Sequence, residues 1–526
     1  MSLILTSVLK GFALLSVGFC KGPVRISDLE ERFVDSCESC PLRGKAGYAR
    51  VPGCGNLGSG IFIVGEQPGV NEAQAGQPFV GQSGQLLDKV LKFYAIDRSR
   101  LYVTNAIKCY VDCCSDDEQE RALEACLPVL AEEVSVGKPS YVLTLGSVAQ
   151  QAFDGRKVTD VRGFVRKFLG LKMLNTFHPA AVFRVPEYFD SIMYDVAKFK
   201  RLIDGKINPR PLRWQVVTSF DDVRLAMEAL MSSPSISFDI ECEGIELGLR
   251  ILSVQMYSRK VDLAYVFPWT GDLISVVKYI LESPIPKIGQ NLMFDVSHLR
   301  VNGINVANIY FDTMVAHHLV RSYLPHDLNT LTSIYTDFDK YDDELNKYVP
   351  TKSTPFSSVP PDILHEYGAK DAIVTYDIHE SLASELAANG MTALFHTVSM
   401  PLLSVLIELR FRGVMFDVPL ARKVAKELDD KIAIAIASLK QITGTDINMN
   451  SPKQMGEFLF GKLGLPVLKT TKTGAPSVSK DVIEKLLSDS RYKHPALDVL
   501  RTFKQASKVR STFLSDISQY LPSMKA

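Results

Sequence analysis

The chain of 526 residues is too long for one ordinary hydrophobic core, so its length predicts about three domains. Hydrophobic residues make up 46% and charged residues 22% of the chain, as is typical of a soluble globular protein. Its 59 basic and 59 acidic residues give a formal net charge of zero. This balance excludes a chain that is basic overall, so any contact with nucleic acid has to come from local patches.

The first twenty residues are apolar enough to suggest a signal peptide or a lipoprotein signal. Lys10 interrupts the apolar run, no basic region precedes it, and Phe19 is a poor residue before Cys20 in a lipoprotein signal. We therefore expect an amphipathic helix packed on the first domain. Further along the chain no run of eighteen apolar residues predicts a membrane span, so we expect no membrane partner and a cytoplasmic protein.

The cysteines are concentrated in the first quarter of the chain. Of nine cysteines, eight precede residue 127, which indicates a localised site and not a scattered disulfide framework. A tight pair, Cys37 and Cys40, is followed by the distant Cys109 and Cys126. Four such thiolates could hold an iron–sulfur cluster or a zinc ion, and buried unreactive cysteines are the alternative.

Residues 1–205 carry the pattern of a three-layer α/β domain. An apolar strand runs into a Gly- and Pro-rich loop in the sequence IFIVGEQPG, and such a loop brings backbone amides close to a ligand. Three more buried strands, each followed by a loop or a helix, are predicted in YVTNAIKC, YVLTLGSVAQQAF and MLNTFHPAAVF.

These blocks closely resemble the family 4 uracil-DNA glycosylases over residues 33–203. Such an enzyme flips a nucleotide out of the duplex, holds the base and stabilises the anionic leaving group. The resemblance implies that Phe79 stacks on the uracil, Asn105 reads its Watson–Crick edge and His178 donates to the carbonyl oxygen that gains charge. Glu66 would activate or orient the water, with Glu72 as a weaker candidate.

The same resemblance implies a structural four-iron four-sulfur cluster, with zinc as the alternative, on Cys37, Cys40, Cys109 and Cys126. The sequence departs from the family at Gln67, where alanine is usual, and in the loop YVDCCSDDEQE. That loop adds Cys113 and Cys114 as rival ligands and removes basic character beside the expected DNA groove. A glycosylase fold kept for binding without turnover is therefore an alternative, although the four uracil-site residues favour retained uracil recognition.

A linker is predicted at residues 206–212, and three acidic signatures follow within residues 213–392: FDIECEG, GQNLMFD and YGAKDA. Asp239 and Glu241 are two apart in an expected strand and share one face. Asp295 lies early in an expected helix, while Tyr367 and Asp371 are four apart on one face of another. Such oxygen ligands suit two Mg²⁺ or Mn²⁺ ions that hydrolyse a phosphodiester. Unrelated surface acids are the alternative for each signature alone.

At these residues the chain resembles the 3′→5′ proofreading exonuclease of family A DNA polymerases, in the branch whose third motif carries a tyrosine. The resemblance implies an RNase H-like α/β fold. It places one metal on Asp239, Glu241 and Asp371 and the second on Asp239 and Asp295, with Tyr367 positioning the water.

Other residues of this region receive roles from the same resemblance or from their local pattern. Ile245 would wedge beside the frayed 3′ end, and Asn291 begins the second motif, so both are expected to contact DNA. Cys242 replaces the more usual threonine and is read as a packing residue. Asp312 is predicted to cap a helix. The neighbouring residues His317 and His318 are predicted to pack and not to bind metal, because neighbours in a helix point apart.

Residues 393–526 are predicted to be an α-helical segment that resembles the start of a family A polymerase thumb, including its SPKQ and GAPS blocks. Its basic side chains suit phosphate contacts on a duplex, and solvated helix faces are the alternative. The residues selected as DNA-binding are Lys469, Lys472, Lys508 and Arg510. The palm and fingers are absent from the sequence, so we expect no polymerisation by this chain alone.

The leading hypothesis is the N-terminal part of a phage-type or bacterial family A replicative polymerase, either split or truncated. Its DNA partner would be a primer 3′ end in single-stranded and duplex DNA, and a second chain would carry the palm and fingers. The setting would be the bacterial cytoplasm, including that of a phage-infected host. Two alternatives are a free-standing repair enzyme that excises uracil and trims 3′ ends, and a non-catalytic scaffold that senses uracil for a polymerase.

Overall fold

The computed structural model describes residues 37–38, 40–351, 354–413, 415–471 and 474–514. The helix expected within residues 1–20, and Lys472, lie outside this part of the chain. The chain divides into two compact units, Met1–Phe411 and Arg412–Ala526. The first unit contains two six-stranded sheets, one in each of the first two expected domains.

The sheet of the first domain has the strand order β2-β4-β3-β6-β8-β7. Its four central strands are parallel, while β2 and β7 pair antiparallel at the two edges. Strand β3 comes before both of its neighbours in the sequence, so the connection to β4 runs to one side of it and the connection towards β6 runs to the other. Ligands of open α/β sheets bind at the carboxyl ends of the strands beside such a change of direction. The strands are β2 (Cys54–Gly55), β3 (Ile61–Gly65), β4 (Tyr102–Asn105), β6 (Tyr141–Leu145), β7 (Val165–Phe168) and β8 (Leu171–Thr176).

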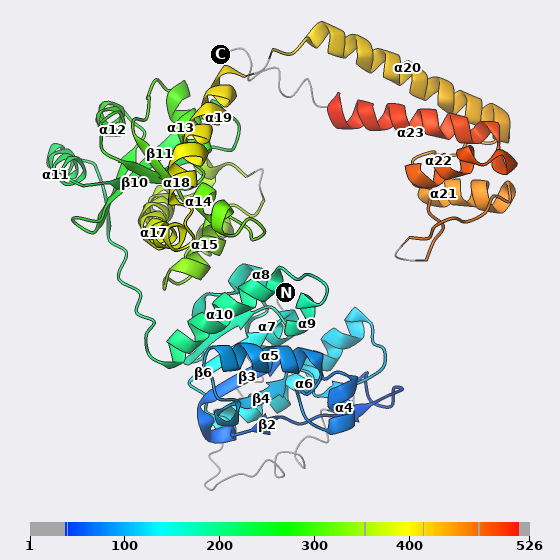
Figure 1. Ribbon diagram of the computed structural model, residues 1–526, viewed down its shortest axis with the longest axis horizontal. Helices are drawn as coiled ribbons and strands as arrows, with labels where there is room; N and C mark the ends of the chain where they lie inside the picture. Colours follow the sequence, from blue (N-terminus) through cyan, green and yellow to red (C-terminus); the bar gives the residue numbers. More distant parts are fainter. Residues whose placement is uncertain (1–36, 39, 352–353, 414, 472–473, 515–526) are drawn as a thin grey trace. The chain divides into compact units, whose positions relative to one another are not determined.

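Two apolar clusters cover the two faces of this sheet and join it to helices on either side. The helices and the sheet between them form the three layers that the sequence predicts (Figure 1). Neighbouring residues of β3 divide between them, since Phe62 and Val64 belong to one cluster and Ile63 to the other. The larger helices are α5 (Gln82–Phe93), α6 (Asp116–Gly137), α7 (Ser147–Asp154) and α10 (Tyr188–Ile203). Three short ones are α4 (Val70–Ala75), α8 (Val158–Val161) and α9 (Pro179–Val182), and a small two-stranded sheet pairs β1 (Ala49–Arg50) with β5 (Cys109–Tyr110).

The second domain is built on a mixed sheet with the order β14-β13-β10-β11-β12-β9. Strands β10, β11 and β12 form an antiparallel meander, and the outer strands pair parallel to it. Segment 206–212 is irregular, and Arg210 within it forms ion pairs with Asp262 and Asp377 of this domain. The strands are β9 (Trp214–Val216), β10 (Ile236–Cys242), β11 (Ile251–Ser258), β12 (Leu263–Pro268), β13 (Lys287–Gly289) and β14 (Ile309–Asp312).

Helix α17 (Pro361–Ala388) crosses this sheet and packs on β10 and β11, so it carries the third acidic signature to the strand that bears the first. The long helical prediction around YGAKDA is therefore confirmed. The other helices are α11 (Phe220–Met231), α12 (Leu273–Leu281), α13 (Leu292–Val301), α14 (Thr313–Val320), α15 (Leu328–Tyr335) and α16 (Leu345–Tyr348).

The segment that follows α17 packs with the second domain. It consists of α18 (Thr392–Leu394), a π-helical turn (Phe395–Ser399) and α19 (Met400–Arg412). By length and composition, Thr392–Arg412 is apolar enough to cross a membrane, with 22% of its most apolar window buried. Its buried residues Phe395, Met400, Leu403 and Ile407 belong to the core of the second domain. The second compact unit therefore begins at Arg412, later than the boundary expected at residue 393.

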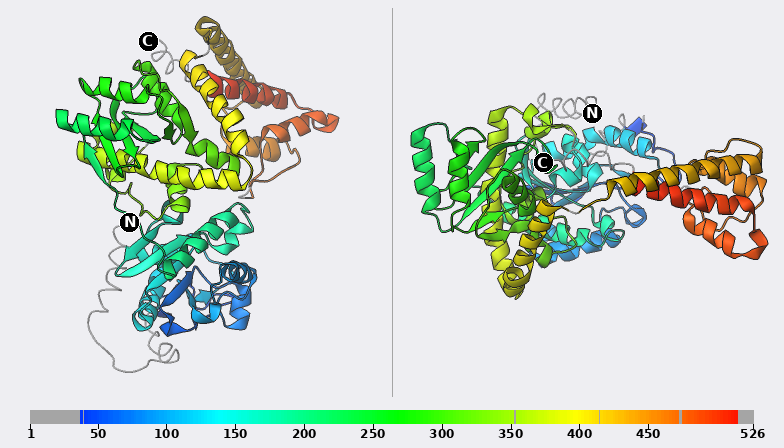
Figure 2. Two further views of the ribbon diagram at one scale, coloured as in Figure 1. Left: turned by 60° about the vertical axis from the view of Figure 1, so that its left-hand side comes forward. Right: turned by 90° about the horizontal axis from the view of Figure 1, so that it is seen from above.

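The second unit is helical and has a core of its own. Helices α20 (Val418–Thr443) and α23 (Pro495–Phe513) run alongside each other in both views of Figure 2. Between them lie α21 (Pro452–Gly456), a π-helical turn (Glu457–Lys462) and α22 (Lys480–Ser488). Buried apolar residues of all these helices form one cluster around Leu439, Met455, Leu486 and Leu497.

Candidate active sites

Three carboxylates meet where α17 crosses β10. Oxygens of Asp239, Glu241 and Asp371 lie within 4.8 Å of one another. Asp239 and Glu241 project from one face of β10, opposite Gln255 and Ser253 of β11. Gly368 allows the close approach of α17, because a Cβ there would lie 2.7 Å from the Gln255 side chain and 2.9 Å from Glu241 Oε1. The structure therefore brings together the first and third acidic signatures.

Asp295 reaches the same site from the first turns of α13. Its Oδ1 accepts a hydrogen bond of 3.1 Å from the backbone N–H of Ile240, between the two acids of β10. Asp295 lines one pocket of about 290 Å³ together with the three clustered acids, Asn291 and Tyr367. It lies outside the group whose oxygens are within 4.8 Å of one another.

The clustered carboxylates of this pocket have raised pKa values and suit a bound cation. Burial, followed by repulsion among the acids, raises the pKa of Asp239 and of Glu241 well above their ordinary values. Burial also raises the pKa of Asp295 to about 8 and that of Asp371 to about 7. Among the described residues, Glu241 Oε1 is buried without a hydrogen-bond partner. Clustered carboxylates that repel one another, one of them with an oxygen that has no donor, fit divalent cations.

Tyr341 belongs to this site and was missed by the sequence interpretation. Its hydroxyl donates a hydrogen bond of 2.6 Å to Asp371 Oδ1, and its ring centroid lies 6.0 Å from that of Tyr367. No local pattern identifies it, because it lies in an irregular segment thirty residues before Asp371.

The other residues singled out in the second domain lie around the metal site or in the core beneath it. Ile245 is 81% exposed beyond the end of β10, and its role as a wedge stays a prediction. Asn291 lies in the left-handed region with φ of 55°, at the start of α13. Cys242 packs in the core, in agreement with its reading as a packing residue. Asp312 accepts a hydrogen bond from Val315 N–H, which confirms the helix cap.

His317 and His318 both contact a third histidine, which the sequence interpretation did not foresee. His326 Nδ1 lies 2.8 Å from His317 Nδ1, and His326 Nε2 lies 3.1 Å from His318 Nδ1. Because His326 uses both ring nitrogens, the three rings form a hydrogen-bonded chain and do not surround one metal ion.

The pocket of the first domain lies at the carboxyl ends of its parallel strands, where ligands bind in this class of sheet. It measures about 290 Å³ and is lined by Phe79, Asn105 and His178 among others. Gly65, at the end of β3, is required there, because a Cβ would lie 2.4 Å from both Asn105 Oδ1 and the Phe79 ring. The structure therefore places the three predicted uracil-binding residues around one cavity.

Two polar groups in this pocket suit a uracil ring. His178 Nδ1 accepts a hydrogen bond of 3.1 Å from Ala180 N–H, and burial lowers the pKa of His178. The neutral ring therefore carries its proton on Nε2, which can donate to a carbonyl oxygen. Within the described structure Asn105 Oδ1 is buried without a partner, so it can accept from an N–H of a ligand.

The two glutamates differ in position. Glu66 Oε1 accepts a hydrogen bond of 3.2 Å from Val148 N–H, and Glu66 lies beside His178 without lining the pocket. Glu72 accepts hydrogen bonds from Gly69 N–H at 3.2 Å and Gly81 N–H at 2.8 Å. Both oxygens of Glu72 are therefore occupied by the backbone of the loop that they shape.

The four predicted thiols, Cys37, Cys40, Cys109 and Cys126, gather around one small cavity with Tyr48 and Lys108. The rival ligands Cys113 and Cys114 do not line it. In the described part of the chain, no three thiols come within 4.8 Å of one another. The choice between zinc and an iron–sulfur cluster stays a prediction.

The side chains predicted to contact phosphates in the second unit differ in whether they already form ion pairs within it. Lys508 is exposed on α23, and Lys469 is exposed beside a short β-bridge between Thr470 and Pro476. Arg510 instead forms an ion pair of 2.9 Å with Asp429 of α20, so part of its charge is used within the unit.

Three family models match successive parts of the chain. The uracil DNA glycosylase superfamily matches residues 52–197, the 3′-5′ exonuclease of family A polymerases matches 214–387, and DNA polymerase family A matches 419–525. The chain is therefore a uracil-DNA glycosylase-like domain fused to a 3′-5′ exonuclease domain and a partial family A polymerase domain. Domains that process DNA imply DNA binding, and the exonuclease domain implies divalent metals.

Individual relatives agree with this division. The type-4 uracil-DNA glycosylase of Pyrobaculum aerophilum is 35% identical over 176 residues, which cover 32% of this chain and 89% of that protein. Through its first domain the chain belongs to the family of that glycosylase. DNA polymerase I of Bacillus subtilis is 32% identical over 219 residues, 42% of this chain and 24% of the relative. The chain thus spans about a quarter of that polymerase.

One solved structure, the POL domain of Pol1 from M. smegmatis in complex with DNA primer-template and dNTP, is also similar. The identity is 19% and the TM-score is 0.46, over 57% of this chain and 49% of that one.

Proposed function

We propose that the second domain is a two-metal 3′→5′ exonuclease that removes nucleotides from a primer end. The observation that carries this proposal is the convergence of Asp239, Glu241 and Asp371 within 4.8 Å, with Asp295 in the same pocket. Two bound Mg²⁺ or Mn²⁺ ions would activate a water and stabilise the leaving oxygen.

The protein's own residues would hold these ions and orient the water. Asp239, Glu241 and Asp371 would hold one ion, and Asp239 with Asp295 the other. Tyr367, one helical turn before Asp371, would orient the attacking water through its hydroxyl, which its raised pKa keeps protonated. Ile245 and Asn291 would separate and hold the terminal nucleotides.

The variant Asp239→Ala tests this assignment, because it removes the one ligand common to both ions. We expect digestion of a single-stranded oligonucleotide to fall by at least about a hundredfold at saturating Mn²⁺. Asp221→Ala is the matched control, since that carboxylate is 83% exposed on α11 and should be dispensable. Equal activity of Asp239→Ala and wild type would refute the assignment.

We infer that the first domain binds and excises uracil, with Glu66 orienting the water. Support comes from Asn105 Oδ1, a buried acceptor that suits the N3–H of uracil, and from the proton on His178 Nε2. His178→Ala should abolish the formation of abasic sites in uracil-containing DNA. The matched control is His494→Ala, because His494 caps α23 through Ala496 N–H as His178 caps α9. Uracil binding without abasic sites in wild type would favour the non-catalytic sensor.

We propose a four-iron four-sulfur cluster on Cys37, Cys40, Cys109 and Cys126, with zinc as the alternative. The gathering of these four thiols around one small cavity, away from Cys113 and Cys114, supports a site on these residues. Anaerobically purified protein should be brown and contain about four iron atoms per chain. Colourless protein with one zinc ion would overturn this proposal.

We propose that residues 419–525 act as part of a family A replicative polymerase of phage type, in the bacterial cytoplasm, with the palm and fingers on a second chain as the leading arrangement and a longer form of this chain as the alternative. The family A polymerase match at these residues supports a role within such a polymerase. Lys469, Lys472, Lys508 and, in part, Arg510 would contact the duplex backbone. Adding a palm-bearing chain should produce primer extension that neither chain shows alone. Without association, the free-standing repair enzyme becomes the better description.

A further inference from the structure

Tyr341 lies against the metal-binding carboxylates without belonging to any of the three acidic signatures. Its hydroxyl is 2.6 Å from Asp371 Oδ1, and Asp371 itself is 6% exposed. Lys370 lies over the outer face of the same ring, with Nζ 5.9 Å from the ring centroid. A hydrogen bond from a neutral phenol to a carboxylate restrains the rotation of that carboxylate.

Two tyrosines thus share one carboxylate, and they reach it from different directions. Tyr367 lies one turn earlier on α17, whereas Tyr341 comes from the irregular segment that follows α15. The Tyr341 hydroxyl donates to Asp371 Oδ1 over 2.6 Å from this second direction. Tyr367 also hydrogen-bonds Asp371, so the two hydroxyls together restrain this carboxylate.

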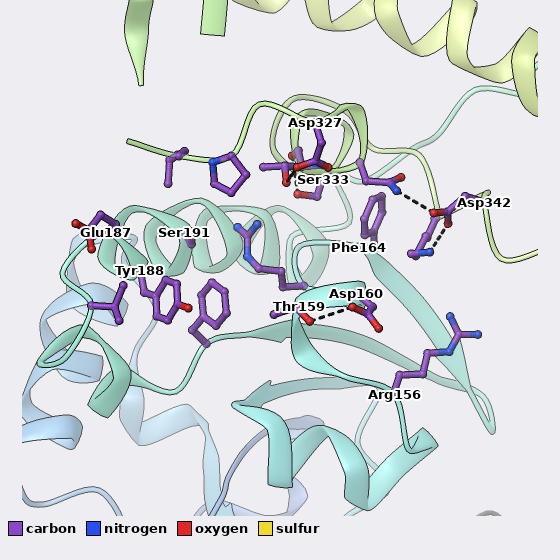
Figure 3. Close-up of a pocket in the computed structure, with 18 of the residues that line it drawn as sticks. Arg156, Thr159, Asp160, Phe164, Glu187, Tyr188, Ser191, Asp327, Ser333 and Asp342 are labelled. Carbon is purple, nitrogen blue, oxygen red and sulfur yellow. Dashed lines mark hydrogen bonds and ion pairs between the residues drawn. The ribbon is translucent and has the colours of Figure 1, made fainter. Parts of the chain in front are cut away.

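The side chains of the residues on both sides of Tyr341 form polar contacts. Asp342 accepts a hydrogen bond of 2.8 Å from Asn329 and forms an ion pair with Lys340, and Figure 3 shows both contacts at the wall of a cavity of about 870 Å³. The next residue, Asp343, forms an ion pair of 2.6 Å with Arg156 of the first domain. Lys340 and Asp342 line this cavity, while Tyr341 between them contacts the metal site.

We propose that Tyr341 is a positioning residue of the exonuclease, which holds the Asp371 carboxylate in the orientation that binds a divalent cation. This proposal rests on the proposed two-metal function and adds a residue to its site. Tyr341 acts through Asp371 and takes no part in the transfer of protons. Outer hydrogen-bond partners of this kind typically contribute about 10-fold to 100-fold to metal affinity.

The test is direct Mn²⁺ binding to the full chain by titration calorimetry, together with the Mn²⁺ dependence of oligonucleotide digestion. Tyr341→Phe removes only the hydroxyl and keeps the ring. We expect it to weaken Mn²⁺ binding about tenfold and to recover most of the wild-type rate at saturating Mn²⁺. Tyr367→Phe is the comparison: because Tyr367 also hydrogen-bonds Asp371 and is proposed to orient the water, we expect weaker binding together with a reduced rate that saturating Mn²⁺ does not restore.

Tyr279→Phe is the matched control, because Tyr279 is 61% exposed on α12 and should affect neither measurement. Unchanged Mn²⁺ affinity in Tyr341→Phe would overturn the proposal, as would a rate that saturating Mn²⁺ does not restore. The binding measurement remains decisive if the wild type binds Mn²⁺ but digests no DNA. In that case the proposed exonuclease activity fails independently of Tyr341.

Discussion

The side chains of the metal site depend for their positions on contacts with residues that are distant in the sequence. The acids of the metal site were predicted because each lies in a short pattern with a clear strand or helix period. Tyr341 and His326 were not, because both lie in irregular segments whose position depends on the packing of α15 and α17. Site residues can thus be predicted when they lie in a helix or strand with a clear period, and not when they lie in a loop.

His317 provides a prediction at this scale. Burial lowers its pKa to about 4, with smaller lowering by His326, Arg321 and His318 and an opposing rise from Asp327. An unfolded histidine has a pKa of about 6.5, so between these values the unfolded chain binds more protons than the folded one. Stability from this residue is complete above about pH 6.5 and is lost as the pH falls towards 4.

We therefore expect the free energy of unfolding to decrease between pH 7 and pH 4, with His317 contributing at most about 3 kcal/mol of the decrease. Urea unfolding of wild type and His317→Leu at several pH values measures this contribution. The variant should show a shallower dependence on pH. An identical dependence in both proteins would show that His317 is not the titrating group.

At the scale of elements, the positions of strands and helices followed from the sequence more fully than their limits. Strand β10 and helices α13 and α17 lie where alternation and helical spacing predict them. The domain boundary predicted at residue 393 differs from the structure, in which the second unit begins at Arg412. The helical period gives no sign of the boundary because it continues through α19, whose buried residues pack in the core of the second domain. Periodicity identifies an element, but the core on which it packs depends on tertiary contacts.

The metal site depends on the close packing of α17 on β10, and a substitution of Gly368 tests this packing. Gly368→Ala places a methyl group 2.9 Å from Glu241 Oε1, so we expect displacement of Glu241, weaker Mn²⁺ binding and a loss of about 1–3 kcal/mol of stability. Gly456→Ala in α21 is the matched control, since a Cβ there meets nothing within 4 Å. Full exonuclease activity in Gly368→Ala would contradict the close packing.

At the scale of the whole molecule, the chain consists of two compact units with separate cores. Leu497 is fully buried in the core of the second unit. Leu497→Ala should destabilise that unit by about 2–5 kcal/mol and leave oligonucleotide digestion intact. Differential scanning calorimetry should show that one transition moves while the other stays. A shift of both transitions would show that the units unfold together.

We propose above all that this chain hydrolyses DNA from the 3′ end with metals held by its clustered acids. The most direct measurement is the digestion of a single-stranded oligonucleotide labelled at its 5′ end, with Mn²⁺ and with a chelator. With Mn²⁺ we expect a ladder that shortens one nucleotide at a time while the 5′ label is retained, and with the chelator no change. An oligonucleotide that stays intact with Mn²⁺, or that is shortened from its 5′ end, would contradict this account.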